Sequence, residues 1–146
     1  MSISSELVVA DASEAEAVLA SDLPSRTWEG FGYKGLDHIK LITLWALVES
    51  GAPRDRFEER LSSLKVHSKG EQGPWADVLP SRMLPALASA SSGESAEFDA
   101  LASAWGNTQE FEGWQEDEVT ELLRLVVELA ESAQLQGKTM ILWRSF

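Results

Sequence analysis

An apolar run between residues 36 and 50 limits the possible folds more than any other feature of this sequence. Asp37 suits the N-cap of a helix, and Gly51 suits the position just after its C-terminus. Between them lie the apolar residues Leu41, Ile42, Leu44, Trp45, Ala46, Leu47 and Val48, which leave almost no polar side on the helix. A helix that is apolar all round must be enclosed by other elements. We therefore predict a buried central helix over about residues 36–50.

The segments around this run predict more helices and two strands. Apolar spacing, caps and proline positions predict helices over residues 13–20, 53–64, 81–91, 94–105 and 116–134. Residues 4–9 and 138–146 are β-prone and should pair, whereas glycine and proline predict loops over 22–35 and 66–77. The expected fold class is mainly α (α+β), a compact helical domain with a small sheet that pairs the N- and C-terminal strands. The length fits a single globular domain over 1–146.

Composition and motifs exclude several function classes. The chain has no cysteine, so it has no disulfide, thiolate metal site or cysteine nucleophile. Its two histidines, His38 and His67, are far apart, and the common phosphate-binding, dinucleotide-binding, serine-hydrolase and zinc-protease motifs are missing. We expect no cofactor, no metal and no catalytic residues, and hence a protein that is not an enzyme. Because the sequence also lacks a classical export signal and a run of about 20 apolar residues, we expect it to be cytoplasmic.

The net charge of −12 is concentrated in part of the chain. Residues 94–131 contain eleven acidic residues and one basic residue, whereas residues 34–93 contain seven acidic and eight basic residues. Nucleic acids and anionic membranes require a basic surface, so we expect neither as a partner. A regional excess of carboxylates instead creates a directed field that attracts a basic protein. The alternative is that the acidic residues only keep the protein soluble.

The segment TQEFEGWQEDEVTE at residues 108–121 is the strongest candidate for a binding surface, because two aromatic residues interrupt its acidic run. Aromatic anchors among charged residues are typical of interfaces. Trp114 precedes a helix and can fold back as a hydrophobic staple, so we expect Phe111 to be the exposed anchor. The predicted partner-binding residues are Glu110, Phe111, Glu112, Glu116, Asp117 and Glu121. The alternative is a solvated helix face on which Arg124 pairs with Glu121 or Glu128.

The loop before the central helix is an alternative ligand-binding site. Glycines ahead of a helix N-terminus can present backbone N–H groups to an anion, and Lys34, Asp37 and His38 could surround an anionic metabolite there. The simpler interpretation is structural, because the glycines allow the chain to turn and Asp37 caps the helix. We favour the structural interpretation and keep a small-anion-binding protein or enzyme as the alternative function.

Three stretches of the sequence carry a resemblance to a known class of proteins. They are WEGFGYKGLDHIKLITLW at Trp28–Trp45, AWGNTQEFEGW at Ala104–Trp114 and LW at Leu142–Trp143. They resemble the immunity proteins, small bacterial proteins found beside secreted toxins. The resemblance implies a cytoplasmic inhibitor that binds a toxin and covers its active site. An acidic protein would be complementary to a toxin with a basic or anion-binding active site. A chaperone or adaptor for a secreted effector is a further alternative.

Overall fold

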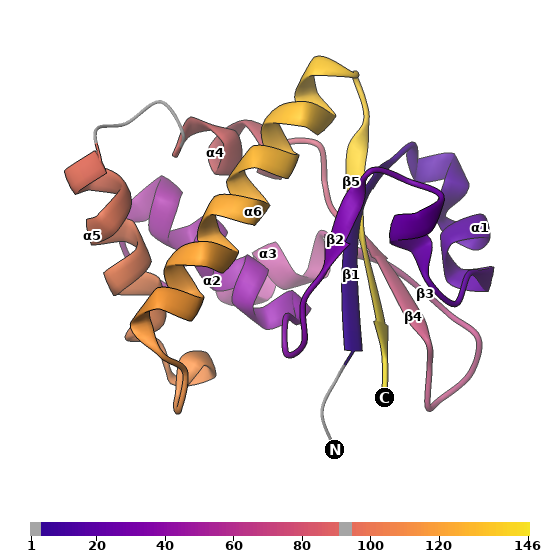
Figure 1. Cartoon of the computed structure of the whole chain (residues 1–146), viewed down its shortest axis with the longest axis horizontal. Coiled ribbons are helices and arrows are strands. Elements are labelled where there is room, and N and C mark those ends of the chain that lie inside the picture. The colour runs from indigo at the N-terminus through magenta and orange to yellow at the C-terminus, as the bar shows by residue number, and fades with distance from the viewer. Residues whose placement is uncertain (1–3, 91–94) are drawn as a thin grey trace.

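The strands in the described part of the chain form one antiparallel sheet. The structure is a computed structural model that describes residues 4–90 and 95–146. Its strands are β1 (Ser4–Ala10), β2 (Gly30–Gly32), β3 (Lys65–Ser68), β4 (Trp75–Val78) and β5 (Thr139–Ser145). They lie in the order β2-β1-β5-β4-β3, so the two terminal strands are neighbours inside the sheet (Figure 1). β1 and β5 pair from Ser4 opposite Ser145 to Ala10 opposite Thr139.

Helices lie on both sides of the sheet (Figure 1). They are α1 (Ala15–Ala20), α2 (His38–Ser50), α3 (Phe57–Ser62), α4 (Met83–Ser89), α5 (Ser95–Gly106) and α6 (Glu116–Leu135), with short 3-10 turns η1 (Ala12–Glu14), η2 (Pro24–Arg26) and η3 (Gln109–Phe111). α1 packs on one face, and the larger helices cover the other. The longest helix, α6, carries acidic residues along its outer side. None of the helices that the structure describes is long and apolar enough to cross a membrane.

Burial on both faces explains why the terminal strands are apolar along most of their length. Leu7 of β1 and Leu142 of β5 pack into the large core under α2, α4, α5 and α6. Val8 and Ile141 point to the opposite face and join a smaller core under α1. Successive residues of a strand point to opposite faces, so a strand that is covered on both sides contains few polar residues.

α2 is the buried central helix that the sequence predicts. Every residue from Lys40 to Leu47 is buried. The Asp37 carboxylate accepts a hydrogen bond from the Lys40 N–H at 2.8 Å and so caps the first turn. Gly51 follows the helix in the left-handed conformation, with φ of 76°, and its N–H donates to the Leu47 carbonyl. Both predicted helix caps are confirmed.

The remaining helices lie near their predicted positions, with shifted ends. α3 is shorter than the predicted 53–64, and α6 extends one residue beyond the predicted 116–134. The helices predicted over 81–91 and 94–105 correspond to α4 and α5. Residues 91 and 94, at the predicted ends of those two helices, lie outside the described residues.

The predicted fold class, mainly α with a small terminal sheet, is wrong, because the molecule is α+β with a five-stranded sheet. The terminal strands pair as predicted, but the predicted loops 22–35 and 66–77 contain β2 and the hairpin of β3 and β4. Glycine is required in β2 because a Cβ at Gly30 would lie 2.1 Å from the Leu7 carbonyl oxygen. β3 and β4 are only four residues long and include the charged residue Asp77. These strands depend on their neighbours, which a local sequence pattern does not reveal.

Candidate functional site

The loop before α2 and the start of α6 lie side by side, although they are far apart in the sequence. The Tyr33 ring stacks on the Trp114 ring, with centroids 5.9 Å apart and an angle of 13° between the planes. The Tyr33 hydroxyl also donates to the Glu118 carbonyl at 3.2 Å. The two regions that the sequence offers as alternative sites are therefore neighbours.

Hydrogen bonds to β1 hold the loop in this position. The Tyr33 N–H donates to the Ser5 carbonyl at 2.9 Å, and the Ser5 hydroxyl donates to the Leu36 carbonyl. Gly35 has φ of 89°, and a Cβ there would lie 2.9 Å from the Trp114 ring. Glycine suits both this backbone conformation and this close contact. The loop thus brings its backbone directly against Trp114.

An open depression of about 530 Å³ lies where the two segments meet. Its lining residues are Gly32, Tyr33, Lys34, Gly35, Gly113, Trp114 and Glu118. The glycines have no side chains to fill the space, so the depression stays open. The rings of Tyr33 and Trp114 form its aromatic wall. Lys34 and Glu118 supply the charged groups of the lining.

Phe111, the predicted exposed anchor, is buried, and this part of the prediction is wrong. Only 2% of its surface is exposed. Its ring lies between Trp105 and Trp114, with centroid distances of 4.7 Å and 4.9 Å. The turn η3 ends at Phe111 and directs the ring into the core. The sequence shows only that Phe111 lies in an acidic run, and this does not reveal the direction of its ring. Trp114, which is only half-buried, is the aromatic residue of this segment that lines the depression.

The aromatic cluster already holds one cation on its buried side. The Lys40 ammonium lies 5.2 Å from the centroid of the Phe111 ring and 5.3 Å from the centroid of a Trp114 ring. Asp37 pairs with the same ammonium at 3.5 Å, and the Lys40 side chain is almost completely buried. Cation–π attraction is stronger where water is removed. These rings therefore lie in a position where they attract positive charge.

Four of the five predicted acidic residues are exposed, and none of the ion pairs between described residues involves them. These four are Glu112, Glu116, Asp117 and Glu121, which we call the acidic face. An open groove of about 630 Å³ follows this side of α6, lined by Gln115, Glu116, Asp117, Thr120, Glu121 and Arg124. Within residues 4–90 and 95–146, Arg124 forms no ion pair with Glu121 or Glu128, although their spacing allows one. The acidic face therefore directs unpaired negative charge toward solvent.

Glu110, the fifth predicted acidic residue, forms an internal ion pair instead. Its carboxylate lies 2.6 Å from the Arg54 guanidinium, and its side chain is 13% exposed. The pair joins η3 to the segment between α2 and α3. Glu110 therefore stabilises the fold and contributes little free charge to the surface.

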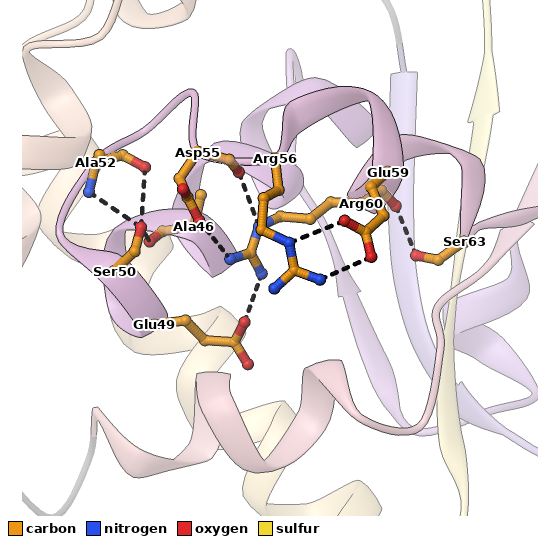
Figure 2. Close-up of polar contacts among 9 residues, drawn as sticks. All are labelled: Ala46, Glu49, Ser50, Ala52, Asp55, Arg56, Glu59, Arg60 and Ser63. Atoms are coloured by element: carbon orange, nitrogen blue, oxygen red, sulfur yellow. Dashed lines mark hydrogen bonds and ion pairs between the residues drawn. The ribbon is translucent and has the colours of Figure 1, made fainter.

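A buried arginine fixes the segment to which Glu110 is joined (Figure 2). The Arg60 side chain is 4% exposed, and its guanidinium pairs with Glu49 at 2.5 Å and with Asp55 at 3.2 Å. The same guanidinium lies 4.8 Å from the centroid of the Trp45 ring. Hydrogen bonding from Arg60 lowers the pKa of Glu49. These carboxylates are occupied by internal partners, so the cluster has a structural role.

The acidic face also influences the depression. Burial raises the pKa of the Tyr33 hydroxyl, and the negative charges of Glu121, Glu118 and Asp117 raise it further. Burial is the larger cause, and the smaller contribution of the three carboxylates indicates a negative potential at the Tyr33 hydroxyl. The acidic face and the depression therefore form one candidate site.

Lys34, Asp37 and His38 do not converge on one ligand position. Lys34 lines the depression, whereas Asp37 caps α2 and pairs with Lys40. His38 is not among the residues that line the depression, and burial, together with the positive charge of Arg144, lowers its pKa. The geometry therefore favours the structural interpretation of this loop.

The site includes Tyr33, Trp114 and Glu118, which are not among the binding residues predicted from the sequence. Glu118 belongs to the acidic run and shares its signal, whereas the contact of Tyr33 with Trp114 depends on the fold. An open site with an aromatic wall and free carboxylates can bind a cationic group through cation–π and ion-pair contacts.

Comparison with protein-family models, with curated proteins and with solved structures finds no match for this chain.

Proposed function

We propose that this protein binds a basic protein partner through the acidic face. The observation that carries the proposal is the position of Glu112, Glu116, Asp117 and Glu121. They are exposed, they have no cationic partner among the residues that the structure describes, and they lie beside an open aromatic depression. A partner surface of like charge would be repelled, whereas a basic surface is complementary.

The resemblance to immunity proteins supports a specific form of this interaction. In this proposal the partner is a secreted bacterial toxin whose active site presents a basic or anion-binding surface. The chain is then a cytoplasmic inhibitor that covers this site, with its carboxylates in the position of the anionic groups of the toxin's substrate. Covering the site is sufficient for inhibition, so the proposal requires no catalytic residue in the inhibitor.

The acidic face should act on the association rate more than on the final affinity. An exposed ion pair contributes only about 0.2–1 kcal/mol. Complementary fields can raise association rate constants by a factor of about 10 to 1,000. This attraction is screened over about 8 Å at physiological ionic strength. Binding should therefore be fast at low salt and should slow as salt is added.

The test is affinity capture from the native host with three tagged proteins. They are the wild type, the double variant Glu112→Lys/Glu121→Lys and the control Asp22→Lys/Glu71→Lys. All four residues are exposed, and both variants change the net charge by the same amount. We expect the wild type and the control to capture a basic protein that the first variant loses. Expression of the captured protein alone should stop growth, and co-expression of the wild type should restore it.

Two results would oppose the proposal. Equal capture of the partner by all three proteins would remove the acidic face from the interaction. A captured protein that does not affect growth would oppose the inhibitor role and would support the chaperone or adaptor alternative.

A further inference from the structure

We propose that the depression lined by Tyr33 and Trp114 receives one arginine side chain of the basic partner. The inference rests on the proposed function, because it names the group by which the partner is anchored beside the acidic face. The depression adjoins the α6 groove in the same candidate site but is lined by different residues, so the two can be tested separately.

The depression offers the groups that a guanidinium uses for binding. Guanidinium planes stack on aromatic rings and donate hydrogen bonds to carboxylates. Tyr33 and Trp114 supply the aromatic wall, and Glu118 supplies a carboxylate at the same place. Glu118 Oε1 accepts a hydrogen bond from the Gln115 N–H at 3.0 Å, whereas Oε2 has no hydrogen-bond partner among the described residues. One carboxylate oxygen is therefore free to accept from a ligand.

The protein makes the same contact within its own structure, with one buried arginine and one exposed arginine. The Arg60 and Arg82 guanidinium groups lie 4.8 Å and 5.3 Å from the centroid of a Trp45 ring. Trp114 has the Lys40 ammonium near one of its rings and Tyr33 stacked on it, so the exposed parts of Trp114 and of the half-buried Tyr33 ring together line the open depression. The outer side of this aromatic cluster therefore has room for a second cation, which this chain does not supply from its described residues.

The surrounding charges favour a cation but include one opposing group. Burial is the main cause of the raised pKa of Tyr33, and the charges of Asp117, Glu118 and Glu121 add to it, so these carboxylates give the depression a negative potential. Lys34 is exposed at the lining and repels an arginine. An anion-binding site would instead use Lys34 as a ligand. Replacement of Lys34 by alanine should therefore strengthen binding of a cation and weaken binding of an anion.

The probe is the peptide acetyl-Arg-Arg-Arg-Arg-amide, and the citrulline peptide of the same length is its neutral counterpart. Affinities are measured by calorimetry in low-salt buffer, after circular dichroism has shown that each variant is folded. Glu118→Gln should weaken binding of the arginine peptide about fivefold, since glutamine keeps the hydrogen bond to the Gln115 N–H but lacks the charge. Glu128→Gln, an equal charge change farther along α6, should change the affinity by less than about twofold.

Two further variants test the aromatic wall and the opposing lysine. Tyr33→Ala should weaken binding about fivefold, whereas Tyr33→Phe keeps the ring, loses only the hydroxyl bond to the Glu118 carbonyl and should weaken binding less. Lys34→Ala should strengthen binding of the arginine peptide about twofold, because it removes one exposed positive charge beside the site. The citrulline peptide should bind much more weakly than the arginine peptide to every variant.

Three results would overturn the inference. The first is equal affinity of the wild type, Glu118→Gln and Tyr33→Ala for the arginine peptide. The second is equal affinity of the wild type for the citrulline and arginine peptides. The third is the lack of any binding of the arginine peptide. If Glu112→Lys/Glu121→Lys is the only variant that weakens peptide binding, the proposed arginine site in the depression is refuted, whereas binding of a basic partner by the acidic face is still supported. The capture experiment decides the proposed function independently.

Discussion

Replacement of Phe111 by alanine should destabilise the fold strongly. The ring is 2% exposed and contacts the rings of Trp105 and Trp114 at 4.7 Å and 4.9 Å. Loss of a buried phenylalanine side chain costs about 3–5 kcal/mol, including the cavity that remains. Trp105 cannot easily fill that cavity, because its Nε1–H donates to the Lys40 carbonyl at 2.9 Å. We therefore expect the free energy of unfolding to fall by about 4 kcal/mol, a large part of the 5–15 kcal/mol typical of a domain.

The measurement is urea unfolding followed by far-ultraviolet circular dichroism. Phe146→Ala is the matched control, because Phe146 is 60% exposed and has one edge-on contact, with Trp75 at 5.4 Å. The control should lose about 1 kcal/mol or less. Phe111→Leu fills part of the cavity and should lie between the two. If Phe111→Ala is as stable as Phe146→Ala, the burial argument is refuted and Phe111 regains the role of exposed anchor.

Three other predictions concern stability. Because burial lowers the pKa of His38 below 6.5, the unfolded chain binds the proton more readily, and stability should fall as the pH drops through about 6.5. His38→Asn should reduce this loss in melting temperatures between pH 7.5 and 5.5, and an unchanged slope would contradict it. Asp77→Ala removes the hydrogen-bonded partner of Arg144, at 2.7 Å and 3.1 Å, and should cost about 3–5 kcal/mol in urea unfolding. Asp77→Leu with Arg144→Met should recover most of that loss, and equal losses would oppose a buried ion pair. Gly35→Ala should lower the free energy of unfolding more than Gly51→Ala in the same assay. Both glycines have positive φ, but only Gly35 lies against an indole ring. Equal losses of stability would contradict that contact.

The sequence predicts the elements whose signals are local. α2 has a cap at Asp37, a terminal glycine at Gly51 and an uninterrupted apolar run, so its existence and enclosure follow from three independent features. α6 and the terminal strands are also recognisable, because their apolar patterns extend over enough residues to distinguish helix from strand.

The missed elements depend on distant partners. Gly30 belongs to a strand because its backbone approaches Leu7 of β1, although glycine usually indicates a turn. β3 and β4 are short, and Asp77 is tolerated inside the sheet only because Arg144 of β5 pairs with it. Each of these features requires a residue far away in the sequence.

The candidate site is predictable only in its charge. The acidic composition of residues 108–121 indicates an exposed, negatively charged surface, and the structure shows that most of its carboxylates are exposed and outside the ion pairs of the described residues. The sequence does not show that Glu110 meets Arg54, or that Phe111 turns inward. It also does not show the stacking of Tyr33 on Trp114, which creates the depression.

The association rate constant with the captured partner, measured over a series of salt concentrations, tests whether the acidic face recruits that partner. We expect the wild-type association rate to fall steeply as salt is added. Glu112→Lys/Glu121→Lys should associate about tenfold more slowly at low salt and depend less on salt, because its field is weaker. Equal rates and equal salt slopes for the wild type and this variant would contradict the claim that the acidic face recruits the partner.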